Sequence, residues 1–199
     1  MNNAFDREAV RTFRFVDCGF DPATGVARLA YAFDDGPELV ETVTLPGAPF
    51  ALDGARAQAA AKALRLLHLV AGVSYYKAAV PGDIRIDGYA IDDATAALLE
   101  DVYLHGLGEF AYRNGLDLHG RIRFPRAAGN AAGGDDGDSR APDLQLRRHA
   151  LVAIGGGKDS LVSIEALRAA GIDQTVAWIG GSQLIAACAT HTGLPTLNI

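Results

Sequence analysis

The feature that most restricts the fold of this chain is a glycine-rich loop between an apolar run and an amphipathic segment. Residues 150–154 are continuously apolar, which is typical of a strand buried on both faces of a parallel sheet. The loop 155–160 follows with the sequence Gly-Gly-Gly-Lys-Asp-Ser. Residues 160–170 then carry apolar side chains at helical spacing and end at Gly171. The order strand, glycine loop, helix predicts the opening of an α/β domain.

The pattern of alternating strands and helices continues to the last residue. A strand is predicted over 175–179, a helix over 182–192 and a third strand from 195 to 199. We therefore expect residues 147–199 to form the first part of an α/β domain with a parallel sheet. Sheets have about five or six strands on average, so three strands predict that this sequence is part of a longer protein.

The first part of the chain has the pattern of an α+β domain, which we expect over residues 1–125. Apolar residues alternate with polar ones in three short runs within 11–45, and the runs are separated by Asp-, Gly- and Pro-rich turns. This alternation predicts a β-meander with one buried face. A short strand is also predicted over 121–124.

Two helices are predicted in the same domain. The first extends from Asp53, a suitable N-cap, to Ala71 and stops at Gly72. Its expected apolar stripe consists of Ala60, Leu64, Leu67 and Ala71, and His68 is expected at the edge of the core. The second helix is predicted over 92–115.

A change in composition separates the two domains. Residues 126–146 are rich in Gly, Ala and Asp without periodicity, which predicts a flexible linker. The formal net charge of −6 argues against a nucleic-acid partner. Two cysteines, Cys18 and Cys188, are too few for a disulfide framework. The start of the chain has no secretory pattern and no apolar run suits a membrane span, so we expect a soluble, cytoplasmic protein without membrane insertion.

The glycine loop has the composition of a phosphate-binding site. A loop that enters a helix presents backbone N–H groups at the positive end of the helix dipole, and glycines let phosphate oxygens approach the backbone. Lys158 adds a positive charge and Ser160 a hydroxyl donor. Asp159 would repel phosphate, so its expected roles are to cap the helix or to hold Mg²⁺. The alternative is a glycine turn that serves packing alone.

Two well-known phosphate loops do not fit the segment. A Walker A loop requires Gly and Ser or Thr where Val152 and Asp159 stand. The dinucleotide fingerprint requires an acidic residue after the second strand, where residues 178–181 are Trp-Ile-Gly-Gly.

The segment resembles the PP-loop of the ATP pyrophosphatase superfamily, whose core is Ser-Gly-Gly-x-Asp-Ser after a first strand. Residues 156–160 match this core, and Gly155 replaces the leading Ser. The resemblance implies that ATP is bound by Gly155, Gly156, Gly157, Lys158, Asp159 and Ser160. It also implies cleavage of ATP between its α- and β-phosphates, with transfer of AMP to an acyl or carbonyl oxygen.

The chain as a whole is similar to a narrower family within that superfamily, the ATP-dependent UDP-muramoyl-dipeptide epimerases of peptidoglycan synthesis. The similarity rests on residues 13–18, 66–78, 103–116 and 155–160. It implies ATP-dependent epimerisation of the terminal L-glutamate of UDP-MurNAc-L-Ala-L-Glu, through adenylation of its carboxylate and with Mg²⁺ as cofactor. Members of that family are about twice as long, so this chain alone is expected to be inactive.

Four further residues are candidates for substrate contacts. Tyr75, Tyr76 and Lys77 follow the first helix and could hold the muropeptide or a UDP phosphate, or they could form an amphipathic edge. His105 lies among glycines, where either a substrate or a neighbouring helix could approach closely. The catalytic acid and base are not identified by any pattern. Other adenylating PP-loop enzymes, such as ligases or nucleoside-thiolating enzymes, and a non-catalytic nucleotide-binding module remain alternative functions.

Overall fold

The computed structural model describes residues 6–126 and 144–199, and within these residues the chain divides into two compact units. The amino-terminal unit comprises residues 6–20, 27–42 and 52–126. The carboxyl-terminal unit comprises residues 144–199, with the turns 21–26 and 43–51 assigned to it. Most of the predicted linker 126–146 lies outside the described residues. Among the described residues, no helix is both long and apolar enough to cross a membrane.

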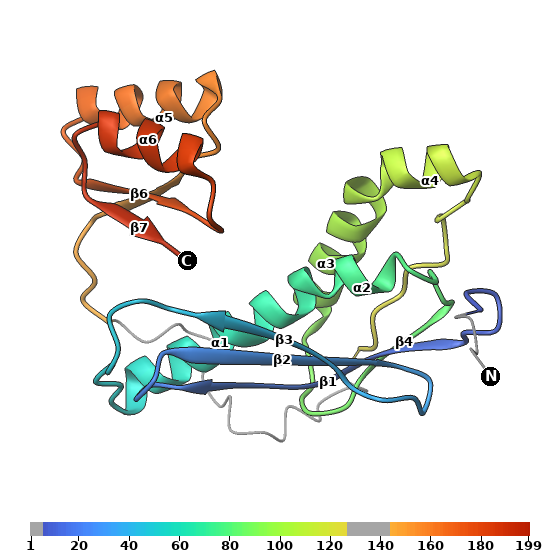
Figure 1. Ribbon diagram of the computed structural model, residues 1–199. Helices are drawn as coiled ribbons and strands as arrows, with labels where there is room; N and C mark the ends of the chain where they lie inside the picture. The colour runs from blue at the N-terminus through green and yellow to red at the C-terminus, as the bar shows by residue number, and fades with distance from the viewer. Residues whose placement is uncertain (1–5, 127–143) are drawn as a thin grey trace. The chain divides into compact units, whose positions relative to one another are not determined.

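A four-stranded mixed sheet forms the base of the amino-terminal unit (Figure 1). Its strands are β1 (Thr12–Asp21), β2 (Val26–Phe33), β3 (Leu39–Thr44) and β4 (Asp83–Ile86), in the order β3-β2-β1-β4. The predicted meander is thus confirmed for β1, β2 and β3. Strand β4, which was not predicted, pairs parallel to β1 with Phe13 opposite Ile84.

The prediction of a strand over residues 121–124 is wrong. Ile122 and Phe124 are buried, so the alternation of apolar and polar residues is real. The segment has no strand partner, however, and the backbone N–H of Phe124 donates to the Glu100 carboxylate at 3.1 Å. An extended segment with one buried face has the same period as a strand, and the alternation does not distinguish the two.

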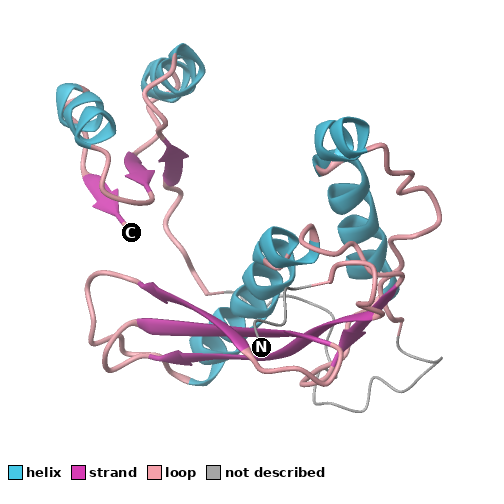
Figure 2. Cartoon of the chain, turned by 45° about the vertical axis from the view of Figure 1, so that its right-hand side comes forward, coloured by secondary structure: helices cyan, strands magenta, loops and turns pink. Residues whose placement is uncertain are grey.

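The helices of this unit lie on one side of the sheet (Figure 2). They are α1 (Gly54–Ala71), α2 (Val73–Tyr76), α3 (Asp93–Gly106) and α4 (Gly108–Asn114). The side chain of Asp53 accepts from the Arg56 N–H, which confirms the predicted N-cap of α1. The single helix predicted over 92–115 is instead two helices, because the chain leaves helical geometry at Leu107 between two glycines.

The core lies between this sheet and its helices. Aromatic side chains dominate it: Phe13 and Phe15 of β1 contact Tyr31 of β2 at ring-centroid distances of 5.9 and 5.8 Å. The predicted apolar stripe of α1 is partly wrong. Leu67, which was expected in it, is exposed, whereas Leu69 of the same helix is buried in the core. The sheet therefore meets α1 along a side rotated from the predicted one.

The carboxyl-terminal unit is a small α/β layer. Its elements are β5 (Ala150–Ala153), α5 (Lys158–Ala169), β6 (Gln174–Trp178), α6 (Gln183–His191) and β7 (Thr196–Asn198). The strands run parallel in the order β5-β6-β7, which confirms the predicted parallel sheet. Both helices lie on the same face (Figure 1), where Ile164 of α5 and Ala189 of α6 pack with Val152 and Val176.

Candidate functional site

The glycine loop connects the carboxyl end of β5 to the start of α5. The N–H of Ile154 donates to the Ala177 carbonyl at 2.9 Å, which anchors the chain to β6 just before the loop. Gly156 then adopts φ +81°, a left-handed conformation that residues other than glycine rarely adopt. Gly157 is the N-cap residue of α5, and no side chain provides a capping hydrogen bond. The first N–H groups of this helix are therefore not satisfied by a side chain.

The backbone of the loop is open rather than packed. A Cβ atom built on Gly155 or Gly157 would meet no heavy atom within 4 Å. At Gly156 the nearest atoms would be Cys188 Sγ and Ile185 Cγ1, both at 4.0 Å, which is ordinary contact. Within the part of the chain that the structure describes, close packing therefore requires none of the three glycines. The space over the backbone is accessible to an oxygen-rich ligand.

The three polar residues after the glycines form the first turn of the helix. Helix α5 begins at Lys158, two residues earlier than predicted, so Lys158, Asp159 and Ser160 are all helical. Lys158 and Asp159 are exposed, and neither forms an ion pair with another residue of the described ranges. The Ser160 hydroxyl donates to the Gly157 carbonyl at 2.9 Å, which braces the loop.

A second glycine turn, which was not predicted as part of the site, follows the neighbouring strand β6. Gly180 has φ +91°, and its N–H donates to the Ile199 carbonyl at 2.8 Å. The Asn198 side chain donates to the Gly180 carbonyl at 2.9 Å. A Cβ on Gly181 would meet nothing within 4 Å. Because β5 and β6 are parallel, both turns lie at the same edge of the sheet, where α/β proteins bind ligands.

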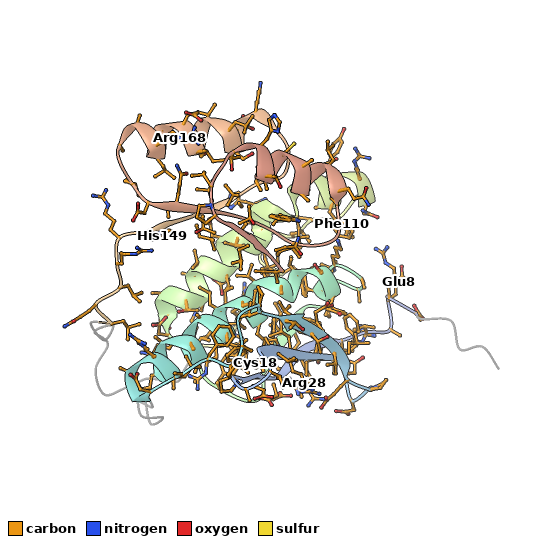
Figure 3. All side chains as sticks on the ribbon, turned by 60° about the vertical axis from the view of Figure 1, so that its left-hand side comes forward. Glu8, Cys18, Arg28, Phe110, His149 and Arg168 are labelled. Carbon is orange, nitrogen blue, oxygen red and sulfur yellow. The ribbon has the colours of Figure 1, made fainter. Side chains whose placement is uncertain are left out.

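A cavity of about 460 Å³ adjoins the loop between α5 and α6. Its walls include Ile154, Gly156, Leu161 and Cys188. Arg168 of α5, labelled in Figure 3, also lines it and donates to the Thr192 carbonyl at 3.0 Å. The cavity places an apolar surface next to the polar loop, an arrangement common in small-molecule sites.

Asp159 is the residue of the loop that could bind a metal ion. No group of three or more His, Cys, Asp or Glu side chains that could hold a metal is present in residues 6–126 and 144–199. Mg²⁺ is usually held by one or two carboxylates together with substrate phosphates and water. An exposed carboxylate in the first turn beside the loop fits that mode of binding.

The tyrosines proposed for substrate contacts have different surroundings in the amino-terminal unit. Tyr75 is half-buried, and its hydroxyl donates to Glu41 at 2.7 Å, which raises its pKa. Tyr76 is fully buried, its hydroxyl donates to the Pro81 carbonyl at 3.1 Å, and burial raises its pKa to about 12. Lys77 is exposed at the end of α2. Tyr75 and Lys77 thus present polar atoms at the surface, whereas Tyr76 supports the core.

His105 lies at the exposed end of α3. Its Nδ1 is 3.0 Å from the Asp101 carboxylate one turn earlier. A Cβ added to the flanking Gly106 or Gly108 would meet no atom within 4 Å, so no neighbouring helix requires these glycines. His105 and the tyrosines belong to the amino-terminal unit, whereas the glycine loop belongs to the carboxyl-terminal unit. Their contacts with a substrate remain predictions.

His68 is wholly buried rather than at the edge of the core. Its Nε2 is 2.9 Å from the Ala30 carbonyl oxygen and its Nδ1 is 3.0 Å from the Tyr89 hydroxyl. Burial lowers the pKa of His68 below 6.5. The neutral ring satisfies both partners when Nε2 donates to Ala30 and Nδ1 accepts from Tyr89. This histidine joins α1 to the sheet.

Comparison with known proteins gives a consistent result over almost the whole chain. The sequence matches the family described as MurL N-terminal domain over residues 4–199. It is 71% identical over 197 residues to UDP-N-acetyl-alpha-D-muramoyl-L-alanyl-L-glutamate epimerase of Xanthomonas oryzae pv. oryzae, a match that covers 99% of this chain and 42% of that protein.

More distant relatives carry the same name. The protein from Salinispora tropica is 37% identical over 190 residues, and the one from a Micromonospora strain is 38% identical over 188 residues. Each match covers 93% of this chain and 40% of the relative. The chain therefore spans about two-fifths of the length of these proteins. No solved structure matches it.

Proposed function

The chain belongs to the MurL N-terminal domain family, and from that premise we propose that it supplies the ATP-binding loop of an epimerase. The full-length protein would convert the terminal L-glutamate of UDP-MurNAc-L-Ala-L-Glu to D-glutamate in peptidoglycan synthesis. The printed name of the relatives, UDP-N-acetyl-alpha-D-muramoyl-L-alanyl-L-glutamate epimerase, supports this choice of substrate. The proposed mechanism is activation of the glutamate carboxylate with ATP.

One observation supports the proposal that ATP binds here. The backbone between β5 and α5 is open, and no side chain caps the start of α5. A Cβ on Gly155 or Gly157 would meet nothing within 4 Å. Lys158, without an ion-pair partner among the described residues, adds a positive charge at that helix start. Backbone N–H groups, the helix dipole and a lysine together suit a polyphosphate.

Adenylation solves the chemical difficulty of this epimerisation. The α-proton of a glutamate carboxylate is very weakly acidic, because its removal would create a second negative charge beside the first. Attack of the carboxylate oxygen on the α-phosphorus of ATP forms an acyl-adenylate and releases pyrophosphate. The neutral acyl group can then stabilise an enolate, and return of a proton to the opposite face inverts the centre. Water finally releases AMP and the D-glutamyl product.

Within this chemistry the chain's own residues bind and orient the triphosphate. The loop N–H groups would donate to phosphate oxygens, and Lys158 would stabilise the negative charge that grows on the departing pyrophosphate. Ser160 holds the loop conformation through Gly157. Asp159 would supply the protein carboxylate for Mg²⁺, which neutralises phosphate charge when bound.

The test uses the full-length enzyme with ATP, MgCl₂ and UDP-MurNAc-L-Ala-L-Glu. AMP, pyrophosphate and D-glutamate are measured after hydrolysis of the product. We expect all three to form with the wild type and none with Lys158→Ala. The control is Arg113→Ala, which removes a cation that pairs with Glu109 on the surface of α4.

Four outcomes would contradict the proposal in different ways. Turnover retained by Lys158→Ala would remove the loop from the mechanism. D-Glutamate formed without AMP would mean that inversion does not require adenylation. AMP and pyrophosphate formed only with a different acceptor would indicate another adenylating enzyme, and ATP binding without any product would indicate a non-catalytic module.

A further inference from the structure

Helix α1 is apolar on the side that faces away from its own core. Its inner side contributes Leu64, His68 and Leu69 to the packing against the sheet. The opposite side carries Leu66, Leu67 and Val70 with exposed fractions of 42%, 42% and 39%. The apolar side of a helix in a globular protein normally faces a packed partner.

The exposed residues form a continuous face rather than scattered positions. Ala63, Leu66, Leu67 and Val70 are spaced i, i+3, i+4 and i+7, so they lie together on one side of the helix. We call these four residues the outer face of α1. None of them is charged. Arg65, which lies between them in sequence, turns to the side, with its guanidinium 5.3 Å from the centre of the Tyr89 ring.

Helix α3 adds a second exposed apolar pair, Leu98 and Val102, which are four residues apart. The two helices are joined where the Tyr103 hydroxyl donates to the Leu69 carbonyl at 2.6 Å. A contiguous apolar face such as the outer face of α1 marks an interaction site more often than a solvated surface. The absence of charge from the outer face of α1 is typical of permanent interfaces, whose buried centres are depleted of charged residues.

The length of the relatives indicates what covers this face. The chain accounts for 42% of the Xanthomonas protein and 40% of the other two, so more than half of each relative lies outside the match. A segment in the same polypeptide is present at a high effective concentration and can cover an apolar face permanently.

We infer that the outer face of α1 is an intramolecular docking surface for the part of the full-length protein that lies outside this domain. The occupant is an apolar surface of that part, without charges opposite Ala63, Leu66, Leu67 and Val70. This inference rests on the family membership and on packing, and it does not depend on the proposed use of ATP.

The test measures access to Leu67 in two chains, the 199-residue chain and the full-length protein, without nucleotide. Leu67→Cys is introduced after Cys18, Cys188 and any cysteines outside this domain are replaced, and the rate of maleimide labelling is measured under native conditions. We expect labelling in the full-length protein to be at least tenfold slower than in the short chain. Glu109→Cys, at a side chain that is 77% exposed on α4, is the control and should react equally fast in both.

Each other outcome overturns the inference. Equally fast labelling at position 67 in the two chains, at the rate of the control, would show that the face is free. Slow labelling in both chains would mean that residues within the short chain cover it. Slow labelling that disappears on dilution, together with a dimer seen by light scattering, would assign the face to a second copy.

A measurement without substitutions guards against variants that do not fold. Hydroxyl-radical footprinting with mass spectrometry compares oxidation of Leu66 and Leu67 in the two wild-type chains, with Tyr112, which is 88% exposed, as internal reference. We expect at least threefold less oxidation of the two leucines in the full-length protein. An unchanged ratio to Tyr112 would contradict the inference, whatever the enzyme does with ATP.

Discussion

Gly72, at the end of helix α1, lies directly against the aromatic ring of Phe15 in the central strand β1. A Cβ at this position would overlap the edge of that ring and would stand 3.0 Å from both Phe15 Cζ and Tyr31 Cε1. The chain thus turns from α1 into α2 at a point where only hydrogen fits between helix and sheet. Gly72 has a right-handed conformation with φ −57°, so contact rather than backbone geometry requires glycine here.

Gly72→Ala should therefore destabilise the amino-terminal unit. Inserting a methyl group into a packed core costs about 1–3 kcal/mol, because the rings of Phe15 and Tyr31 must move. Urea unfolding monitored by circular dichroism would measure the change. Gly54→Ala is the matched control at the other end of α1, where a Cβ meets nothing within 4 Å, and it should be neutral or slightly stabilising. Equal stability of the two variants would contradict the prediction.

The buried hydroxyl of Tyr103 should contribute measurably to the attachment of α3. It donates to the Leu69 carbonyl at 2.6 Å in a fully buried position. Tyr103→Phe keeps the ring and removes the hydrogen bond, so we expect a loss of about 1 kcal/mol in the free energy of unfolding. Tyr112→Phe, at an exposed side chain on α4, should change nothing. If both variants unfold at the same urea concentration as the wild type, the bond does not contribute to stability.

The stability of the amino-terminal unit should fall as the pH drops below about 6.5, in part because of His68. Burial lowers the pKa of this side chain in the folded state below its ordinary value of 6.5. The unfolded chain then binds more protons than the folded chain in the window from 6.5 down to the folded pKa. Stability present above pH 6.5 is therefore lost progressively as the pH falls through that window.

A substitution that does not titrate should flatten this dependence. His68→Gln is expected to lower stability at pH 7.5, because it disturbs the contacts with Ala30 and Tyr89. Its stability should then change less than that of the wild type between pH 7 and 5, as measured by urea titrations at each pH. His119→Gln replaces an exposed histidine and should retain the wild-type slope. An undiminished slope in His68→Gln would assign the pH dependence to other groups.

Substitutions in the glycine loop should distinguish effects on the stability of the fold from effects on ATP binding. Gly157→Ala introduces a methyl group into open space at φ −92°, so the free energy of unfolding should fall by less than about 1 kcal/mol. ATP affinity of the full-length protein should nevertheless fall at least tenfold, because the methyl group occupies the space proposed for phosphate. Isothermal titration calorimetry and urea unfolding would measure the two effects.

Two other glycines of the same unit provide the comparison. Gly156→Ala must force an alanine to φ +81°, at a cost of about 1–2 kcal/mol, and should reduce both stability and ATP affinity. Gly171, with φ +65°, lies just past the opposite end of α5, so Gly171→Ala should reduce stability and leave ATP affinity unchanged. Wild-type ATP affinity in Gly157→Ala would contradict the proposed site.

Much of the local structure could be predicted from the sequence. Asp53 and Ser182 stand where helices α1 and α6 were expected to begin, and both act as N-caps through their own side chains. The parallel strands and the glycine loop of the carboxyl-terminal unit were also predicted. These features depend on residues within one or two turns or on a simple alternation, so a short stretch of sequence contains the information.

The sequence alone singled out only part of the candidate site. The loop 155–160 stands out because several unusual residues adjoin in the chain. The turn at Gly180 and Gly181 was missed as a partner of that loop, because its relevance comes from the parallel pairing of β5 with β6. A pattern of strand, glycine turn and helix that occurs twice was the available signal.

The sequence by itself thus determined the types of most elements, several of their caps and the position of the glycine loop. Only the tertiary structure decided that β4 pairs with β1, that Tyr76 faces the core and that Leu69 rather than Leu67 lies inside. Those outcomes depend on contacts between residues far apart in the chain, such as Phe15 with Gly72. A side chain becomes buried only when the chain brings a distant partner to cover it, and no local pattern states which of the apolar residues of α1 that will be.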